Sequence, residues 1–138
     1  MSNIEKAKEF ISLATDLNTT GFFDVFVEYS QPDNRILSEL IVTENLSPSY
    51  LSDKLNLSRV NVTNSLNNLE NDGLITRAID PTDRRKVICN ITELGKKKIT
   101  KLTQKATKFL ASIFDLLTDE MSDNLVKTLK IIQNHFQK

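Results

Sequence analysis

The sequence predicts a mainly α-helical fold with one small β-hairpin, an α+β arrangement. Over most of the chain, apolar residues recur three or four positions apart, which is the spacing of an amphipathic helix. Between Leu74 and Thr92 the spacing changes to two, which is typical of strands. The length of 138 residues suits a single domain. No apolar run approaches the roughly 20 residues of a membrane-spanning helix, and we expect a cytoplasmic protein.

Local start and stop signals define the first two helices. Ser2 and Glu5 have the spacing of a capping box, in which a hydroxyl and a carboxylate bind free backbone N–H groups. The first helix is therefore expected from Ser2 to about Leu17. Helix-breaking residues at 18–21 predict a kink or short loop, after which helix resumes to about Tyr29.

Two short helices are expected in the next part of the chain. The polar segment 32–34 interrupts the chain, and apolar residues within 36–41 then form one side of a short helix. Ser47 followed by Pro48 is a strong helix start, because the hydroxyl caps the helix and Pro is well tolerated at its first position. Leu51 and Leu55 are expected on the buried side of this second short helix.

A fifth helix and a hairpin follow. Ser58 is a cap for a helix that runs to Asp72, and Gly73 ends it because glycine adopts the left-handed conformation without strain. Strands are expected over 74–80 and 87–92. The highly charged segment 81–86 between them predicts a turn.

Two longer helices complete the chain. Thr92 caps a helix expected to reach Leu116, about 37 Å long at about 1.5 Å per residue. Thr118 begins the last helix, with Asp119 and Glu120 in its first turn. Both helices, like the first, carry apolar stripes that exceed what one small domain needs to cover, which predicts a dimer. The stripe residues are Ile99, Leu102, Ala106, Phe109, Ile113, Leu116, Leu125, Leu129, Ile132 and Phe136.

The charges are distributed unevenly along the chain. The formal net charge is zero, with 18 basic and 18 acidic residues. Segment 1–53 holds three basic and nine acidic residues, whereas segment 54–108 holds twelve basic and five acidic residues. A locally positive segment can attract phosphate groups whatever the total charge. Six of the lysines, between Lys96 and Lys108, are interpreted more simply as the solvated face of the long helix.

The helix from Ser58 to Asp72 has two chemically different faces. Val62, Leu66 and Leu69 lie together on one side, while the opposite side is rich in asparagine. An asparagine side chain offers a paired donor and acceptor to adenine, and the methyl groups of Val or Thr can contact thymine. The alternative is an ordinary solvated helix. The preceding helix and the basic hairpin favour binding in the major groove.

The hairpin turn combines cations with carboxylates. Arg84, Arg85 and Lys86 lie beside Asp80 and Asp83. A planar guanidinium suits both phosphate and a narrow minor groove, and a neighbouring carboxylate can fix its orientation. The alternative, a solvated charged turn, is disfavoured because the hairpin directly follows a candidate recognition helix.

The order of these elements, two helices joined by a tight connection and then a hairpin with a basic tip, is that of a winged helix-turn-helix. Within this order stand Leu46-Ser47-Pro48, Leu51-Ser52, Val62-Thr63, Leu69-Glu70, Gly73-Leu74-Ile75, Arg77, Asp80-Pro81, Asp83-Arg84-Arg85, Thr92 and Gly95. Through these residues the chain resembles the MarR family of bacterial transcription regulators, closely over about 35–96 and by pattern in the flanking helices.

The resemblance implies a winged-helix homodimer that reads a palindromic site. It implies a single domain in which 33–96 form the winged helix-turn-helix and 1–31 with 97–138 form a helical dimerisation region. It also implies that Asp83 and Arg85 act together on the minor groove. The chain departs from the family at Asn64, often basic in relatives, and at Ser52, usually alanine.

Other binding chemistries are weaker candidates. Cys89 is expected inside the hairpin with Val87 and Ile91, as a small core residue rather than a redox sensor. A single histidine, His135, does not make a metal site. Aromatic residues could line an effector pocket, but their near-helical spacing favours packing in the core or a dimer interface. They are Phe10, Phe22, Phe23, Phe26 and Tyr29.

The sequence therefore predicts a dimeric, sequence-specific DNA-binding transcription regulator, a repressor that responds to a small ligand or stress signal. Its expected partners are palindromic double-stranded DNA, a second copy of the chain and a small-molecule effector, with no membrane, metal, cofactor or catalytic residues. The alternative is a winged-helix protein–protein interaction module without a DNA target. An enzyme is disfavoured, since no phosphate-binding glycine loop or catalytic triad is present. The expected DNA contacts are Ser58, Arg59, Val60, Asn61, Thr63, Asn64, Asn67, Asp83, Arg84, Arg85 and Lys86.

Overall fold

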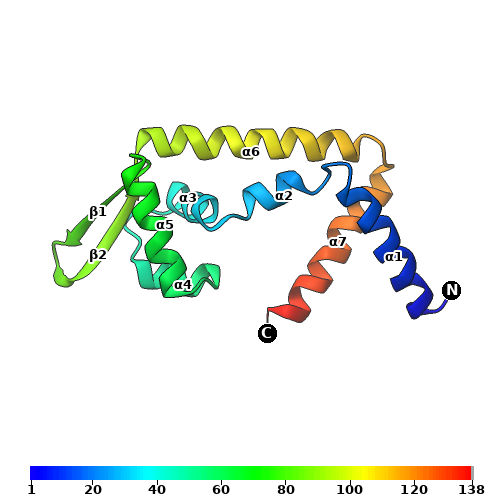
Figure 1. Ribbon diagram of the computed structural model, residues 1–138, viewed down its shortest axis with the longest axis horizontal. Helices are drawn as coiled ribbons and strands as arrows, with labels where there is room; N and C mark the ends of the chain where they lie inside the picture. The colour runs from blue at the N-terminus through cyan, green and yellow to red at the C-terminus, as the bar shows by residue number, and fades with distance from the viewer. Residues whose placement is uncertain (138) are drawn as a thin grey trace. The chain divides into compact units, whose positions relative to one another are not determined.

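The computed structural model describes residues 1–137 and is mainly helical with one two-stranded antiparallel sheet (Figure 1). It divides into two compact units, Met1–Thr103 and a second that begins at Gln104. The elements are α1 (Asn3–Asn18), α2 (Asp24–Tyr29), α3 (Pro32–Val42), α4 (Pro48–Leu55), α5 (Arg59–Asn71), β1 (Ile75–Asp80), β2 (Asp83–Ile91), α6 (Glu93–Phe114) and α7 (Asp119–Phe136).

The first two helices confirm the local signals. The Ser2 N–H donates to Glu5 Oε2 at 2.9 Å and the Glu5 N–H donates to Ser2 Oγ at 3.2 Å, so the capping box is complete. The helix ends at Asn18, with Thr19 as its C-cap, and Gly21 takes a positive φ of 82° before α2 begins. The polar segment 32–34 does not precede α3 but forms its first turn, because Pro is tolerated there.

Helices α4 and α5 are joined by a tight connection. Ser47 Oγ accepts from the Tyr50 N–H at 3.1 Å, and Ser58 Oγ accepts from the Asn61 N–H at 3.1 Å, so both predicted caps are confirmed. Asn56 adopts the left-handed conformation that ends α4. The hydroxyl of Ser52 donates to the Leu57 carbonyl at 2.6 Å and stabilises the connection.

The hairpin differs from the prediction at its tip. The expected turn over 81–86 is wrong, because β2 already begins at Asp83. Ile79 lies opposite Val87 while Asp80 lies opposite Asp83, so Arg84, Arg85 and Lys86 form a bulge in β2. Polar groups close this turn: the N–H and hydroxyl of Thr82 both donate to Asp80 Oδ1, at 2.9 and 2.8 Å.

The hydrophobic core lies beneath α5 and the base of the hairpin. Leu46 and Cys89 exchange two backbone hydrogen bonds of 3.2 and 2.7 Å, which join the α3–α4 connection to β2. Cys89 is buried as predicted. Val87 was expected on the same inner face, but it is 38% exposed and its partner Ile79 is 62% exposed, because the hairpin extends beyond the core. The core consists of Ile36, Leu37, Leu40, Leu46, Leu51, Leu55, Val62, Leu66, Leu69, Leu74, Ile75, Cys89, Ile99 and Leu102.

The start of α6 is fixed to the turn between α5 and β1. The Thr92 hydroxyl donates to the Gly73 carbonyl at 2.7 Å, and the Thr92 N–H donates to the Leu74 carbonyl at 3.0 Å. Thr92 Oγ1 also accepts from the Gly95 N–H at 3.1 Å, which confirms it as the helix cap. Gly95 thereby lies directly against the Leu74 backbone, where a Cβ atom would collide with the Leu74 carbonyl oxygen.

The ends of the long helices follow their caps. Helix α6 ends at Phe114 rather than at Leu116, because the N–H groups of Leu116 and Leu117 bind carbonyls only three residues back and tighten the last turn. Thr118 Oγ1 accepts from the Met121 N–H at 3.2 Å and begins α7 as predicted. Within the described residues, neither these helices nor any other is both long and apolar enough to cross a membrane.

We predict that Gly95→Ala lowers the free energy of unfolding by about 1–3 kcal/mol, the usual cost of overpacking a filled site. The added methyl would meet the Leu74 carbonyl and lie 2.7 Å from Ile91 Cγ1, so α6 must shift. Chemical denaturation followed by circular dichroism measures the change.

Gly73 provides the matched control. It has a φ of 75° with nothing within 4 Å of an added Cβ, so alanine there is disfavoured by conformation alone. Asparagine tolerates the left-handed region. Gly73→Asn should therefore recover most of the stability that Gly73→Ala loses, whereas Gly95→Asn should recover none of the stability that Gly95→Ala loses. Equal recovery at both positions would contradict the steric explanation.

Candidate nucleic-acid interface

The outer face of α5 is polar and open to solvent. The inner face buries Val62, Ser65, Leu66 and Leu69, as the helical spacing predicts, with Ser65 as an additional buried residue. Every predicted contact residue on this helix and its cap is exposed. These are Ser58, Arg59, Val60, Asn61, Thr63, Asn64 and Asn67.

Hydrogen bonds within the helix decide what some of these side chains can offer a partner. The Thr63 hydroxyl donates to the Arg59 carbonyl at 2.9 Å, so its methyl group is the part left for a contact. Within the described residues, the side chains of Asn61 and Asn64 make no hydrogen bond, and both retain a donor and an acceptor. The first two turns of α5 therefore present amide and methyl groups together.

Arg77 connects the hairpin to α5, a contact that the sequence reasoning missed. Its Nη2 atom donates to Asn67 Oδ1 at 2.8 Å and to Glu70 Oε1 at 2.9 Å. The hydrogen bond from Arg77 lowers the pKa of the Glu70 carboxyl, and the same bond raises the pKa of Arg77. Arg77 was noted only as part of a motif, because a contact ten residues away depends on how β1 packs against α5.

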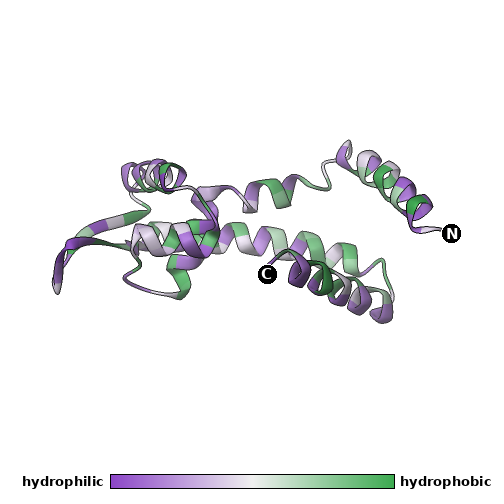
Figure 2. Ribbon diagram, turned by 90° about the horizontal axis from the view of Figure 1, so that it is seen from below, coloured by the Kyte–Doolittle hydropathy of each residue, from purple (hydrophilic) through white to green (hydrophobic). Residues whose placement is uncertain are grey.

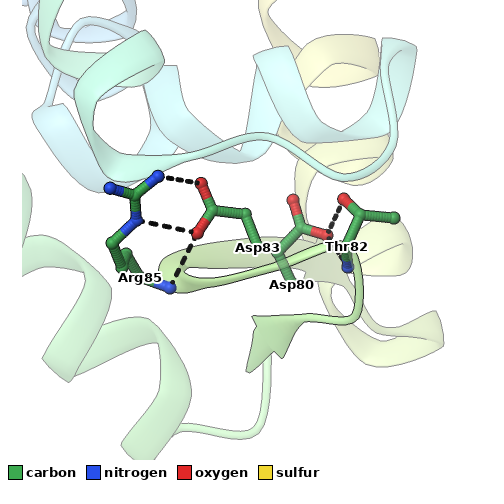
Figure 3. A network of polar contacts seen from close by, with 4 residues as sticks. All are labelled: Asp80, Thr82, Asp83 and Arg85. Atoms are coloured by element: carbon green, nitrogen blue, oxygen red, sulfur yellow. Dashed lines mark hydrogen bonds and ion pairs between the residues drawn. The ribbon is translucent and has the colours of Figure 1, made fainter.

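The hairpin tip holds an arginine in a fixed orientation (Figure 3). Asp83 Oδ1 accepts from the Arg85 backbone N–H at 3.0 Å and from Arg85 Nε at 3.2 Å, while Oδ2 accepts from Nη2 at 3.3 Å. The hydrogen bond from the Arg85 side chain, and to a smaller extent the one from its backbone N–H, holds the pKa of Asp83 below its ordinary value. The carboxylate therefore stays charged at neutral pH and keeps the arginine in place.

The tip nevertheless presents its cations outward. The Arg85 side chain is 90% exposed although Asp83 is largely covered. The pKa of Asp80 is also lowered, chiefly by its hydrogen bonds from Thr82. Arg84 and Lys86 are exposed on the same bulge. The carboxylates are thus engaged within the turn, and the free guanidinium N–H groups are available to an acceptor outside it.

The remaining candidate groups do not form a binding centre. Cys89 is buried, and burial raises the pKa of its thiol to about 11, the opposite of what a redox sensor needs. Within residues 1–137 no cluster of His, Cys, Asp or Glu could hold a metal ion. Of the five aromatic residues considered together, Phe22, Phe23 and Phe26 form ring contacts with centroids 5.1–6.2 Å apart.

The other two aromatic residues lie elsewhere. Tyr29 packs against the core, and Phe10 lies exposed on α1. The structure therefore does not gather the five rings around one described cavity.

Comparisons with known proteins agree with this architecture. Residues 32–86 match the model of the MarR family. The HTH-type transcriptional regulator YfiV of Bacillus subtilis is 29% identical over 120 residues, which cover 84% of this chain and 75% of YfiV. A MarR family protein structure from Bacillus stearothermophilus covers 100% of both chains, with a TM-score of 0.73 and 22% identity. The structure of the transcriptional repressor CouR bound to a 23-mer DNA duplex covers 96% of this chain and 99% of CouR, with a TM-score of 0.71 and 22% identity.

A helix-turn-helix followed by a two-stranded hairpin defines this chain as a winged helix-turn-helix protein. Together with the curated relatives, the family match identifies residues 32–86 as a winged helix-turn-helix of the MarR family of transcription regulators. Its curated relatives are transcription regulators rather than enzymes.

The Cys89 environment yields a pH prediction. In the unfolded chain the thiol ionises near its ordinary pKa of 9.0, whereas in the folded protein it stays protonated up to about pH 11. The unfolded state therefore loses a proton first, and the free energy of unfolding should fall as pH rises from about 9 to 11. Urea titrations over this range, with Cys89→Ala as the control that lacks this pH dependence, measure the effect.

The same burial predicts that iodoacetamide leaves the native thiol unmodified at pH 8 and alkylates it fully in denaturant. Alkylation of native protein at the rate of a free thiol would contradict the buried position.

Proposed function

We propose that the chain is a homodimeric, sequence-specific DNA-binding repressor of transcription. The observation that carries the proposal is that one compact unit exposes two surfaces suited to contact DNA. They are the amide-rich face of α5 and the outward guanidinium of Arg85. The repressor assignment is further supported by CouR, which shares this fold and is described as a repressor bound to DNA.

Helix α5 would enter the major groove, whose width admits one α-helix. Asn61 and Asn64 retain the donor and acceptor pair that matches adenine, and Val60 with the methyl of Thr63 can contact thymine methyl groups. Ser58 and Arg59, at the start of the helix, are placed to bind phosphate or guanine.

The bulge of β2 would contact the minor groove and its phosphates. Arg85 is already oriented by Asp83, so less side-chain entropy is lost when it inserts. Arg84 and Lys86 add neighbouring positive charge. A narrow minor groove has an enhanced negative potential that favours arginine.

The first and last helices of the chain would form the dimer. Helices α1 and α7 bury none of their residues within one chain, although both carry large apolar side chains. Figure 2 shows these hydrophobic residues on the helix after the N-terminus and on the helix that ends at the C-terminus. Large unpartnered apolar surfaces mark interaction sites, and a second copy is the proposed partner. We therefore propose segments 1–31 and 97–138 as the dimerisation region and 33–96 as the DNA-binding part.

Leu129 on α7 tests the dimer. Leu129→Asp should convert the dimer to a monomer at micromolar concentration, because a buried unpaired carboxylate is strongly disfavoured. Native mass spectrometry gives the readout, with Gln133→Asp as the control for an equal charge change at an exposed polar position. A wild-type monomer would contradict the proposed dimer.

A substitution of Arg85 tests the proposed contact between the hairpin and DNA. Arg85→Ala should weaken operator binding about tenfold and reduce the slope of log K against log salt by about one, since one phosphate contact is lost. Fluorescence anisotropy at several salt concentrations measures both quantities. Lys108→Ala removes an equal charge from the solvated face of α6, and the same loss in that control would show a general charge effect instead.

Selection of bound sites from random DNA tests the function as a whole. A regulator should enrich a palindrome, whereas a protein–protein interaction module would enrich no sequence. Adding small phenolic compounds to the operator complex then tests for an effector that releases DNA. Release at a saturable concentration would identify such a ligand.

A further inference from the structure

Asn67 differs from every other asparagine of α5. The side chains of Asn61, Asn64, Asn68 and Asn71 make no hydrogen bond within the described residues, whereas Asn67 Oδ1 accepts from Arg77 Nη2 at 2.8 Å. Glu70 holds the same Nη2 atom at 2.9 Å, one helical turn further along. Arg77 is thus shared between two residues on the exposed side of α5.

The chemistry of this contact fixes which atom of Asn67 faces outward. A guanidinium group only donates hydrogen bonds, so the amide must turn its oxygen toward Arg77. The Nδ2 group then points away from that partner. Because Glu70 also binds Arg77, the guanidinium cannot rotate away without losing an ion pair.

We propose that Arg77 is a positioning residue that makes Asn67 a hydrogen-bond donor toward DNA. Held in this way, Asn67 would favour a base with an acceptor at its major-groove edge, namely guanine O6 or N7, thymine O4 or adenine N7, and would disfavour cytosine, which presents only a donor there. Its oxygen already accepts from Arg77, so its contact with a base would run through Nδ2, whereas the side-chain oxygens of Asn61 and Asn64 have no such partner within the described residues. This inference rests on the proposed function, in which α5 lies in the major groove.

The arrangement also suits a reader rather than a purely structural link. Asn67 lies on the exposed face with Asn64, one turn from Thr63, and does not belong to the core. Fixing an exposed amide before binding reduces the entropy lost on complex formation. The side chain of Arg77 is itself 26% exposed, so the network lies at the surface where DNA would approach.

Site selection with variants tests the proposal. Wild-type protein should discriminate against cytosine, the base without a major-groove acceptor, at one symmetric pair of operator positions. Arg77→Ala should reduce discrimination there by about five- to tenfold, the value of one hydrogen bond, and leave the other positions unchanged. Asn67→Ala should cause the same loss, and the double variant should add nothing further. Thr76→Ala, a neighbouring exposed change in β1, is the matched control.

A second variant keeps the test decisive if Arg77→Ala does not fold. Asn67→Asp retains an acceptor for Arg77 but lacks the donor, so the preference at that position should disappear while circular dichroism stays native. A preserved preference in either folded variant, or an equal loss at all positions, would overturn the positioning role. If wild-type protein enriches no site at all, the proposed function itself fails.

Discussion

The close approach of Gly95 to the Leu74 backbone is the constraint on which the winged helix-turn-helix depends. At this point α5 has just ended at Asn71, β1 begins, and Thr92 starts α6. Three elements therefore share one turn, and their directions are set together. A side chain at position 95 would separate them, because the Leu74 carbonyl occupies the space that a Cβ needs. The base of the hairpin and α5 are thus positioned by the same short segment.

At the hairpin tip, polar contacts rather than core packing stabilise the conformation of the chain. Near the hairpin tip the apolar pair Ile79 and Val87 is exposed, so burial cannot hold the strands there. Asp80 and Asp83 instead each accept several hydrogen bonds from the turn and the bulge. The region keeps a defined conformation without adding apolar surface, which suits a segment that meets a charged partner.

The sequence predicted what depends on local chemistry. Ser2, Ser47, Ser58 and Thr118 cap helices as expected, because a cap needs only a hydroxyl near an N–H three residues ahead. The bulge after Asp83 was missed, since strand register depends on the partner strand and on the turn. The Arg77 network was missed for a related reason. Its partners lie seven and ten residues away, and only the packing of β1 beside α5 brings them together.

The ion pairs at Arg77 and Arg85 show where some of the acidic residues offset the basic ones. In the winged helix-turn-helix, Asp83 binds Arg85 and Glu70 binds Arg77, so carboxylates offset positive charge next to the residues proposed to read DNA. Each pair weakens the general attraction to phosphate. Each pair also fixes a side chain. Asp83 orients the guanidinium of Arg85, and Glu70 holds Arg77, which in turn binds the amide of Asn67. A reader built in this way relies less on charge than on preorganised geometry, so its discrimination between sequences should exceed its affinity for DNA in general.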